Sequence, residues 1–195
     1  MKTVYFVTTN EGKVRNAQAA LKLIGIRVKQ VAIELIESRA EDPADIALEK
    51  ARQAYRKLKR PVIVEDSGFF IKALGGFPMT HIKFSLKTLG LKNILHALKG
   101  AKSRKAEWRM TLAYVWGPGK YHRFTFIEKG EIAKSPRPIK REMMSDYWRV
   151  YIPKMIPNRK ALCEMTDKDL RAWQDYYAKN NQFMMFGRWL KGRKR

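Results

Sequence analysis

The sequence has little cysteine and no long hydrophobic run. Its single cysteine, Cys163, excludes an internal disulfide and any metal site built from several thiolates. No apolar run approaches the roughly 18 residues that a membrane-spanning helix needs. The opening segment MKTVYFVTTN is interrupted too soon by Asn10 and Gly12 to be a secretion signal. We therefore expect a protein of the reducing cytoplasm with no membrane partner.

Acidic residues are also scarce. The chain has 18 Asp and Glu against 41 Lys and Arg, which gives a formal net charge of +23. A charge of this size attracts polyanions through its long-range field, and the attraction weakens with salt. Nucleic acid is therefore a candidate partner; a solvated basic surface with no dedicated partner is the alternative. We expect one domain over residues 1–186 and a basic C-terminal tail over residues 187–195, which holds five Arg and Lys.

Hydrophobic residues are plentiful. They make up 45% of the chain, which is enough for a packed core. Strand-like and helical patterns alternate in the first half, and strand-like runs dominate the second. The predicted strands are 2–9, 26–36, 61–64, 108–116, 121–127 and 147–152, and the predicted helices are 13–24, 44–58, 85–98 and 167–177. This order favours an α/β fold with a mixed sheet and flanking helices.

Three polar clusters follow strand ends or begin helices. The first is the strand-to-helix turn Thr8-Thr9-Asn10-Glu11-Gly12-Lys13. Its hydroxyls and helix amino terminus offer donors to a phosphate, and Lys13 offers a cation. A loop with a solvated lysine is the alternative interpretation.

The second cluster lies on the Ala-rich helix, which Asp42 and Pro43 are expected to start. Asp45 and Glu49 are four residues apart and share one helix face, so together they could hold a divalent metal or simply face solvent. The third cluster is Glu65-Asp66-Ser67-Gly68, directly after an apolar strand. Buried carboxylates are costly unless a metal or a lysine compensates them. Asp66 is therefore the strongest candidate for binding magnesium and orienting an attacking water.

In this order the segments resemble the inosine-triphosphatase (Ham1-like) family of nucleoside triphosphate pyrophosphatases. The resemblance covers about residues 3–90 and rests on FVTTNEGKVRNAQ, EDPADIALEKARQAYRKL, PVIVEDSGFFIKALGGFP and HIKFSLKTLG. It implies an elongated α/β domain in two lobes, with a long mixed sheet and a nucleotide cleft between the lobes. It also implies a homodimer that needs Mg²⁺ and cleaves a nucleoside triphosphate to the monophosphate and pyrophosphate.

The resemblance assigns roles to individual residues. Five residues match family positions that contact the triphosphate: Thr8, Asn10, Lys13, Lys50 and Lys83. Asp45 stands where the family has a metal-binding Glu. Asp66 matches the catalytic carboxylate, which also holds the metal, and Ser67 lies beside it in the substrate-binding motif.

The match fails at the family's base pocket. Trp148 could stack on a base, but Arg149 stands where the family has an Asp that accepts hydrogen bonds from the purine edge. The family's later Ser-His-Arg triplet has no counterpart. Because a donor replaces an acceptor, we expect a base other than hypoxanthine, either modified or rich in acceptors.

Two alternatives stay open. The fold could have been converted into a nucleic-acid-binding or nucleic-acid-processing protein, or into an inactive subunit. Aromatic residues interleaved with cations near the C-terminus could stack on single-stranded nucleic acid or pack inside the protein. These aromatic residues are Trp173, Tyr176, Tyr177, Phe183, Phe186 and Trp189.

Overall fold

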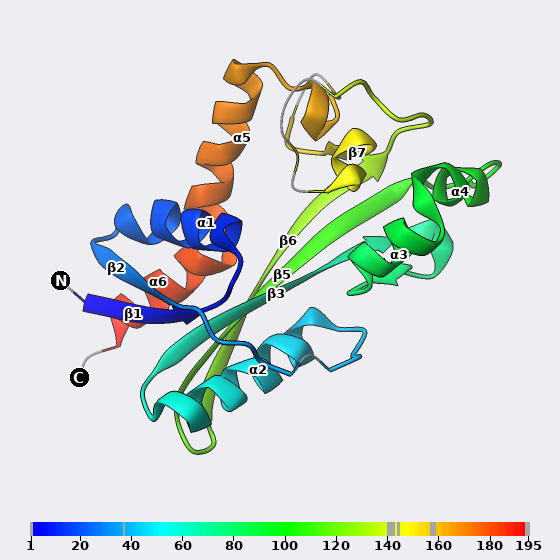
Figure 1. Cartoon of the computed structure of the whole chain (residues 1–195). Coiled ribbons are helices and arrows are strands. Elements are labelled where there is room, and N and C mark those ends of the chain that lie inside the picture. The colour runs from blue at the N-terminus through cyan, green and yellow to red at the C-terminus, as the bar shows by residue number, and fades with distance from the viewer. Residues whose placement is uncertain (1, 37, 140–142, 144, 157–158, 194–195) are drawn as a thin grey trace. The chain divides into compact units, whose positions relative to one another are not determined.

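The computed structural model describes residues 2–36, 38–139, 143, 145–156 and 159–193 (Figure 1). The strands are β1 (Lys2–Val7), β2 (Ile26–Val31), β3 (Val62–Ile71), β4 (Pro78–Met79), β5 (Lys105–Gly117), β6 (Lys120–Ile132) and β7 (Tyr151–Pro153). The helices are α1 (Glu11–Lys22), α2 (Pro43–Leu58), α3 (Ile82–Thr88), α4 (Gly90–Ala97), α5 (Asp167–Asn180) and α6 (Gln182–Gly192). Three short 3-10 turns are η1 (Lys72–Leu74), η2 (Asp146–Arg149) and η3 (Leu162–Glu164).

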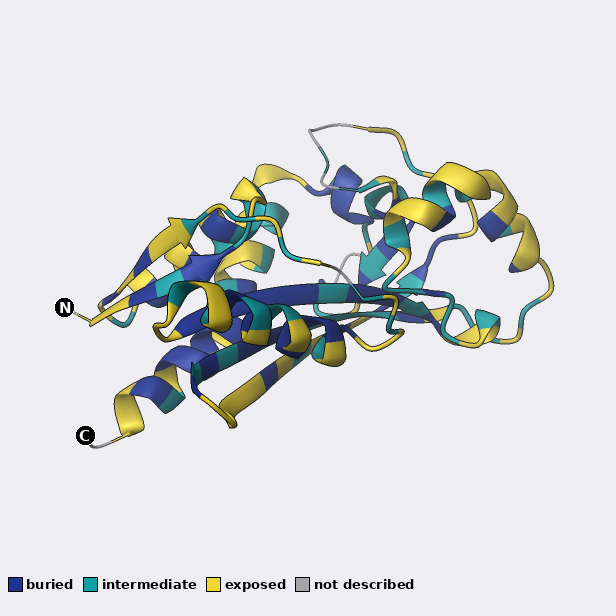
Figure 2. Ribbon diagram, turned by 60° about the horizontal axis from the view of Figure 1, so that its bottom comes forward, coloured by how far each residue is buried: buried dark blue, intermediate teal, exposed yellow. Residues whose placement is uncertain are grey.

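The strands form one seven-stranded mixed sheet, which confirms the predicted α/β class. Its order is β2-β1-β3-β5-β6-β7, and β4 pairs with β3. β1 runs parallel to β2 and β3, whereas β4 and β7 run antiparallel to their neighbours. In Figure 2 the central strand β3 is buried along most of its length, and the outer helix surfaces are exposed.

The chain divides into two compact units. Unit 1 comprises Met1–Ser67, Met110–Phe126 and Tyr176–Arg195, and unit 2 comprises Gly68–Arg109 and Ile127–Asp175. β3, β5 and β6 therefore contribute residues to both units. No helix in the described part of the chain has the length and apolar content to span a membrane.

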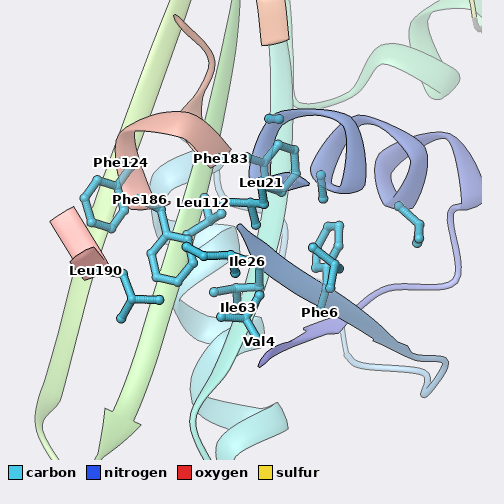
Figure 3. Close-up of a cluster of buried hydrophobic side chains, with 14 residues drawn as sticks. Val4, Phe6, Leu21, Ile26, Ile63, Leu112, Phe124, Phe183, Phe186 and Leu190 are labelled. Atoms are coloured by element: carbon cyan, nitrogen blue, oxygen red, sulfur yellow. The ribbon is translucent and has the colours of Figure 1, made fainter. Parts of the chain in front are cut away.

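Unit 1 has a hydrophobic cluster on each face of its part of the sheet. One cluster joins β1, β3, β5 and β6 to α1 and α6, as Figure 3 shows for Phe6, Leu21, Ile63, Phe183 and Phe186. The other joins strand residues to the Ala-rich face of α2. Phe183 and Phe186 are almost fully buried, so these two aromatic residues pack inside the protein.

The α6 helix corrects the predicted tail. Residues 187–192 are part of this helix, and Gly187 and Leu190 are buried against unit 1. A Cβ at Gly187 would lie 2.3 Å from Cδ1 of Ile24, so the glycine lets α6 approach α1 closely. The sequence interpretation followed the cations, which lie on the exposed side, and missed the apolar side of the same helix.

Other boundaries also differ from the prediction, three of them near the candidate site or in unit 2. β3 continues to Ile71, so Glu65 and Asp66 lie inside a strand rather than after one. The expected helix over 85–98 is two helices, separated at Gly90, whose φ of +69° belongs to the left-handed region. The expected strand over 147–152 begins as the 3-10 turn η2 and becomes β7 only at Tyr151.

Unit 2 is centred on an aromatic cluster. The ring of Phe69 lies 4.6 Å from Trp108, 4.7 Å from Tyr147 and 5.5 Å from Tyr151, centroid to centroid. The hydroxyl of Tyr151 donates to the backbone carbonyl of Glu128 at 2.8 Å. These contacts join β3, β5, β6 and β7 inside the unit.

Candidate active site

The candidate site is organised by two neighbouring carboxylates in the middle of β3. Glu65 is 6% exposed and Asp66 is 7% exposed. Because side chains alternate along a strand, the two carboxylates point to opposite faces of the sheet. Each carboxylate meets a lysine from a different helix, Lys13 of α1 for Glu65 and Lys50 of α2 for Asp66.

The Asp66–Lys50 pair is short and largely shielded from solvent. The Lys50 Nζ lies 2.7 Å from Asp66 Oδ2, and the backbone N–H of Ser67 donates to Oδ1 at 2.8 Å. A carboxylate has about four acceptor positions, and these two contacts use one on each oxygen. Acceptor capacity therefore remains on Asp66 for a cation or a water molecule.

The Glu65–Lys13 pair lies on the face covered by α1 and α6. The Lys13 Nζ is 2.8 Å from Glu65 Oε2 and also donates to the Glu65 backbone carbonyl at 3.1 Å. Burial raises the pKa of the Glu65 carboxyl above its usual value, and the charge and hydrogen bond of Lys13 oppose that rise. Gln182 of α6 donates to the other carboxylate oxygen at 3.5 Å. These contacts hold the Lys13 ammonium beside β3, where its side chain is 23% exposed.

The turn between β1 and α1 is ordered by its own polar side chains. The Thr8 hydroxyl accepts from the Asn10 N–H at 3.1 Å, and the Asn10 side chain caps α1 by accepting from the Lys13 N–H at 3.1 Å. Gln30 of β2 donates to the Thr8 carbonyl at 3.0 Å. These hydrogen bonds fix the turn in which the amino terminus of α1 follows the carboxyl end of β1. Phosphate sites are frequent at this position in α/β proteins.

Asp45 has a different environment. It lies in the first turn of α2, which Asp42 caps as predicted. Its side chain is 65% exposed and forms an ion pair with Arg123 of β6 at 3.1 Å. Within the described residues, no three His, Cys, Asp or Glu side chains gather into a group that could hold a metal ion. The predicted pairing of Asp45 with Asp66 around a metal stays a prediction.

The other predicted site residues belong to unit 2. Lys83 is exposed on α3. The Trp148 ring lies 6.0 Å from the Trp173 ring at an interplanar angle of 77°. The Nε of Arg149 donates to the backbone carbonyl of Arg137 at 3.3 Å, so part of this guanidinium is engaged by the protein. The predicted roles of Lys83, Trp148 and Arg149 stay predictions.

Sequence reasoning assigned no role to Glu65 or Gln182. Glu65 precedes Asp66 in the same strand, so the alternation of strand side chains was a usable signal that it points to the opposite face of the sheet. Gln182 had no such signal, since it is 117 residues away from Glu65 in the chain and meets it only through the packing of α6.

Comparison with known proteins places this geometry in a known context. A family model described as the Ham1 family matches residues 4–173. The chain is 30% identical over 190 residues to a dITP/XTP pyrophosphatase of Pyrococcus horikoshii, covering 96% of each chain. It is 39% identical over 134 residues to a dITP/XTP pyrophosphatase of Methanopyrus kandleri, covering 69% of this chain and 71% of that one.

Solved structures share the fold. A HAM1 protein from Coxiella burnetii superposes with a TM-score of 0.78 at 20% identity, covering 99% of this chain and 100% of that chain. The Staphylococcus aureus Ham1 protein superposes with a TM-score of 0.75 at 18% identity, over the same shares.

Proposed function

The chain belongs to the Ham1 family, and we propose that it is a nucleoside triphosphate pyrophosphohydrolase, which cleaves its substrate to a nucleoside monophosphate and pyrophosphate. The names of its relatives from Pyrococcus and Methanopyrus support this reaction class. The observation that carries the proposal is the buried Asp66 on β3, held by Lys50 at 2.7 Å with acceptor capacity left. The comparisons do not favour the alternative of a fold converted to nucleic-acid processing.

The phosphate-binding residues come from both helices of the site. Lys13 and Lys50 bring two ammonium groups to β3 from opposite faces of the sheet, at residues that lie beyond the last β3 position paired with β1. The amino terminus of α1 adds backbone donors there. Thr8 and Asn10 keep the turn before α1 in shape through the two hydrogen bonds within it. Ser67, directly after Asp66, adds a hydroxyl. We assign these groups to the triphosphate chain, whose negative charge they complement.

Asp66 performs the chemical step in this proposal. Its carboxylate accepts a proton from, or orients, the water that attacks the α-phosphorus, and pyrophosphate leaves. The Ser67 N–H and the Lys50 ammonium fix the direction of the carboxylate, so little reorganisation is needed when the water reacts. The same lysine offsets the cost of a buried negative charge.

The residues present fit a divalent cation with oxygen ligands. Magnesium is usually bound through one or two carboxylates together with substrate phosphates, rather than by a complete protein cage. Asp66 has acceptor capacity left, and Asp45 is an exposed carboxylate with a single ion pair to Arg123. We propose that these two residues would hold Mg²⁺, which when bound neutralises charge on the triphosphate.

We further propose that the base specificity differs from that for inosine. Arg149 presents donors where the family resemblance places an acceptor, and Trp148 offers an aromatic ring beside it in the chain. A cytoplasmic location and a homodimer are also proposals, based on the single buried cysteine and on the family resemblance, respectively.

The test is pyrophosphate release with Mg²⁺ over a panel of canonical, deaminated and modified nucleoside triphosphates in both sugar forms. Asp66→Asn keeps the acceptor for the Ser67 N–H but removes the carboxylate charge, so we expect kcat/KM to fall about 100-fold or more. Asp175→Asn, an exposed site on α5, is the matched control and should leave turnover unchanged.

Turnover of one substrate that is lost only in Asp66→Asn supports the proposal and shows which base Arg149 admits. Equal turnover by both variants would remove Asp66 from the chemistry. An unchanged circular dichroism spectrum for Asp66→Asn is needed to assign the loss to chemistry rather than to folding.

A further inference from the structure

One end of unit 1 carries cations without any acidic residue. The segments 2–10, 12–33, 50–64, 110–126 and 176–193 contain no Asp or Glu. Together they supply β1, β2, most of α2, the turn between β5 and β6, and α6. The acidic residues of unit 1 are confined to Glu11, to β3 and to residues 34–49.

Contacts between these segments form a closed circuit around one end of unit 1. Lys2 at the start of β1 donates to the Leu190 carbonyl of α6 at 3.3 Å. Arg193, at the end of α6, lies 4.6 Å from the ring centroids of both Trp116 and Trp189, which connects α6 to β5. The short turn then leads from β5 to β6.

The circuit continues from β6 through α2 and back to β1. Arg52 of α2 lies 5.0 Å from the Tyr121 ring centroid of β6. Arg60, after α2, lies 4.9 Å from the ring centroid of Tyr5 in β1, and Lys29 of β2 lies 5.9 Å from the same ring. In Figure 1 the amino end of β1, the carboxyl end of α6, the β5–β6 turn and the end of α2 lie on the same side of unit 1. We call this surface the basic end.

The basic end is separate from the candidate active site. It surrounds the amino end of β1, where Lys2 lies, whereas the turn from Thr8 to Lys13 follows the carboxyl end. Tyr5 pairs with Val62 of β3, and Asp66 lies four residues further along β3, roughly 13 Å away. A partner bound at the basic end would therefore leave the Asp66–Lys50 pair accessible.

A purely solvated surface does not explain this arrangement. Protein surfaces usually mix both signs, because like charges brought together repel and destabilise the compact state. At the border of the basic end, Arg123 does meet an acid, Asp45. Inside it, three arginines lie over aromatic rings instead, and a guanidinium stacked in this way still presents its N–H groups to a phosphate.

We propose that the basic end binds single-stranded nucleic acid through its phosphates, with the exposed ring of Tyr121 adding a contact to a base. The cations supply sequence-independent affinity, and the exposed part of the Tyr121 ring supplies a stacking surface beside Arg52. A single strand is flexible enough to follow a circuit around one end of a small unit. A duplex is too stiff to do so, since its persistence length is about 150 base pairs.

The test is fluorescence anisotropy of a labelled 20-nucleotide single strand with the full chain, at increasing salt. The variant combines Lys29→Gln, Arg60→Gln, Lys120→Gln and Arg193→Gln. The matched control removes four exposed lysines of unit 2: Lys92→Gln, Lys99→Gln, Lys102→Gln and Lys129→Gln. Both variants lower the net charge equally, so they separate the surface from the overall charge.

We expect the basic-end variant to bind about 30-fold more weakly or worse. The slope of log affinity against log salt concentration should become shallower by up to about 3, as the loss of four phosphate contacts predicts. The control should lose less than about 3-fold. Both should keep wild-type pyrophosphate release, because neither touches the candidate site. Equal losses in the two variants, or tighter binding of a duplex of the same length, would overturn the proposal.

Two further measurements use the wild-type chain. Ultraviolet crosslinking of a 4-thiouridine oligonucleotide should label peptides that contain Trp116, Tyr121 or Trp189, and labelling confined to unit 2 contradicts the proposal. Capture by anionic phospholipid vesicles without any binding of the oligonucleotide would assign the surface to membranes instead. Failure of pyrophosphate release would leave the binding result intact, so the two proposals are tested independently.

Discussion

Glu128 is a carboxyl group buried in unit 2 without a cation beside it in the described structure. It accepts from the Trp173 indole N–H at 2.5 Å, and the Tyr151 hydroxyl donates to its backbone carbonyl. Burial raises the pKa of Glu128 to about 7, and the hydrogen bond from Trp173 opposes this rise. Glu107 is a further acidic residue near Tyr151. A protonated Glu128 is therefore favoured in the folded state.

This burial predicts a stability that depends on pH. Because the folded pKa of Glu128 lies above the unfolded value of 4.5, the contribution is complete below that unfolded value and is lost as the pH rises through about 7. The loss is on the order of 3 kcal/mol. Glu128→Gln keeps an acceptor for Trp173 and cannot ionise, so urea denaturation between pH 5 and pH 8 should give a flatter profile. An identical profile for both proteins would exclude Glu128 as the cause.

The Lys13–Glu65 pair predicts a separation between stability and activity. Lys13→Met leaves the buried Glu65 charge without its partner, so we expect the free energy of unfolding to fall by about 2 kcal/mol or more. Adding Glu65→Gln removes that charge and should restore most of the stability. It should not restore pyrophosphate release, because the ammonium is still missing. Equal stability of the single and double variants would show that Glu65 carries no such cost.

At the scale of the elements, α6 packs closely against α1 because Gly187 has no side chain at the contact. A Cβ there would lie 2.3 Å from Cδ1 of Ile24 and 2.7 Å from Cδ2 of Leu21. Leu21 is fully buried and has little room to move. Gly187→Ala should therefore lower the free energy of unfolding by about 1–3 kcal/mol, measured by thermal or urea denaturation.

Gly192 is the matched control in the same helix. No atom lies within 4 Å of a Cβ built there, and the residue is exposed. Gly192→Ala should leave stability unchanged or raise it by up to about 1 kcal/mol, since alanine favours helix. Equal destabilisation by both substitutions would mean that the loss of backbone flexibility, rather than steric overlap at Gly187, lowers the stability.

The start of α2 was predicted well from local sequence. Asp42 accepts from the Ala44 N–H at 2.8 Å and Pro43 opens α2, as the residue order indicates. Helix and strand ends were predicted less well when they depended on remote packing. β3 continues past Asp66 because its carboxylate is compensated by Lys50, 16 residues earlier in the chain, which lets an acidic residue stay inside a buried strand.

At the scale of the whole molecule, the charge is large but unevenly placed. The net charge of +23 follows from composition, whereas the basic end exists because segments from four distant parts of the sequence meet at one end of unit 1. The same packing divides the aromatic residues proposed as a stacking surface into buried and partly exposed ones. Phe183 and Phe186 are buried, and Trp189 stays partly exposed beside Arg193.

The sequence by itself determined the α/β class, the Asp42 cap of α2, the family and the candidate residues around Lys13, Lys50 and Asp66. These follow from short-range patterns, because periodicity, capping and motif spacing act over a few residues. Only the tertiary structure decided that Lys50 meets Asp66 while Lys13 meets Glu65, and that residues 187–192 of the expected tail belong to a packed helix. Those outcomes depend on which faces of distant elements become buried together, and no local pattern encodes that choice.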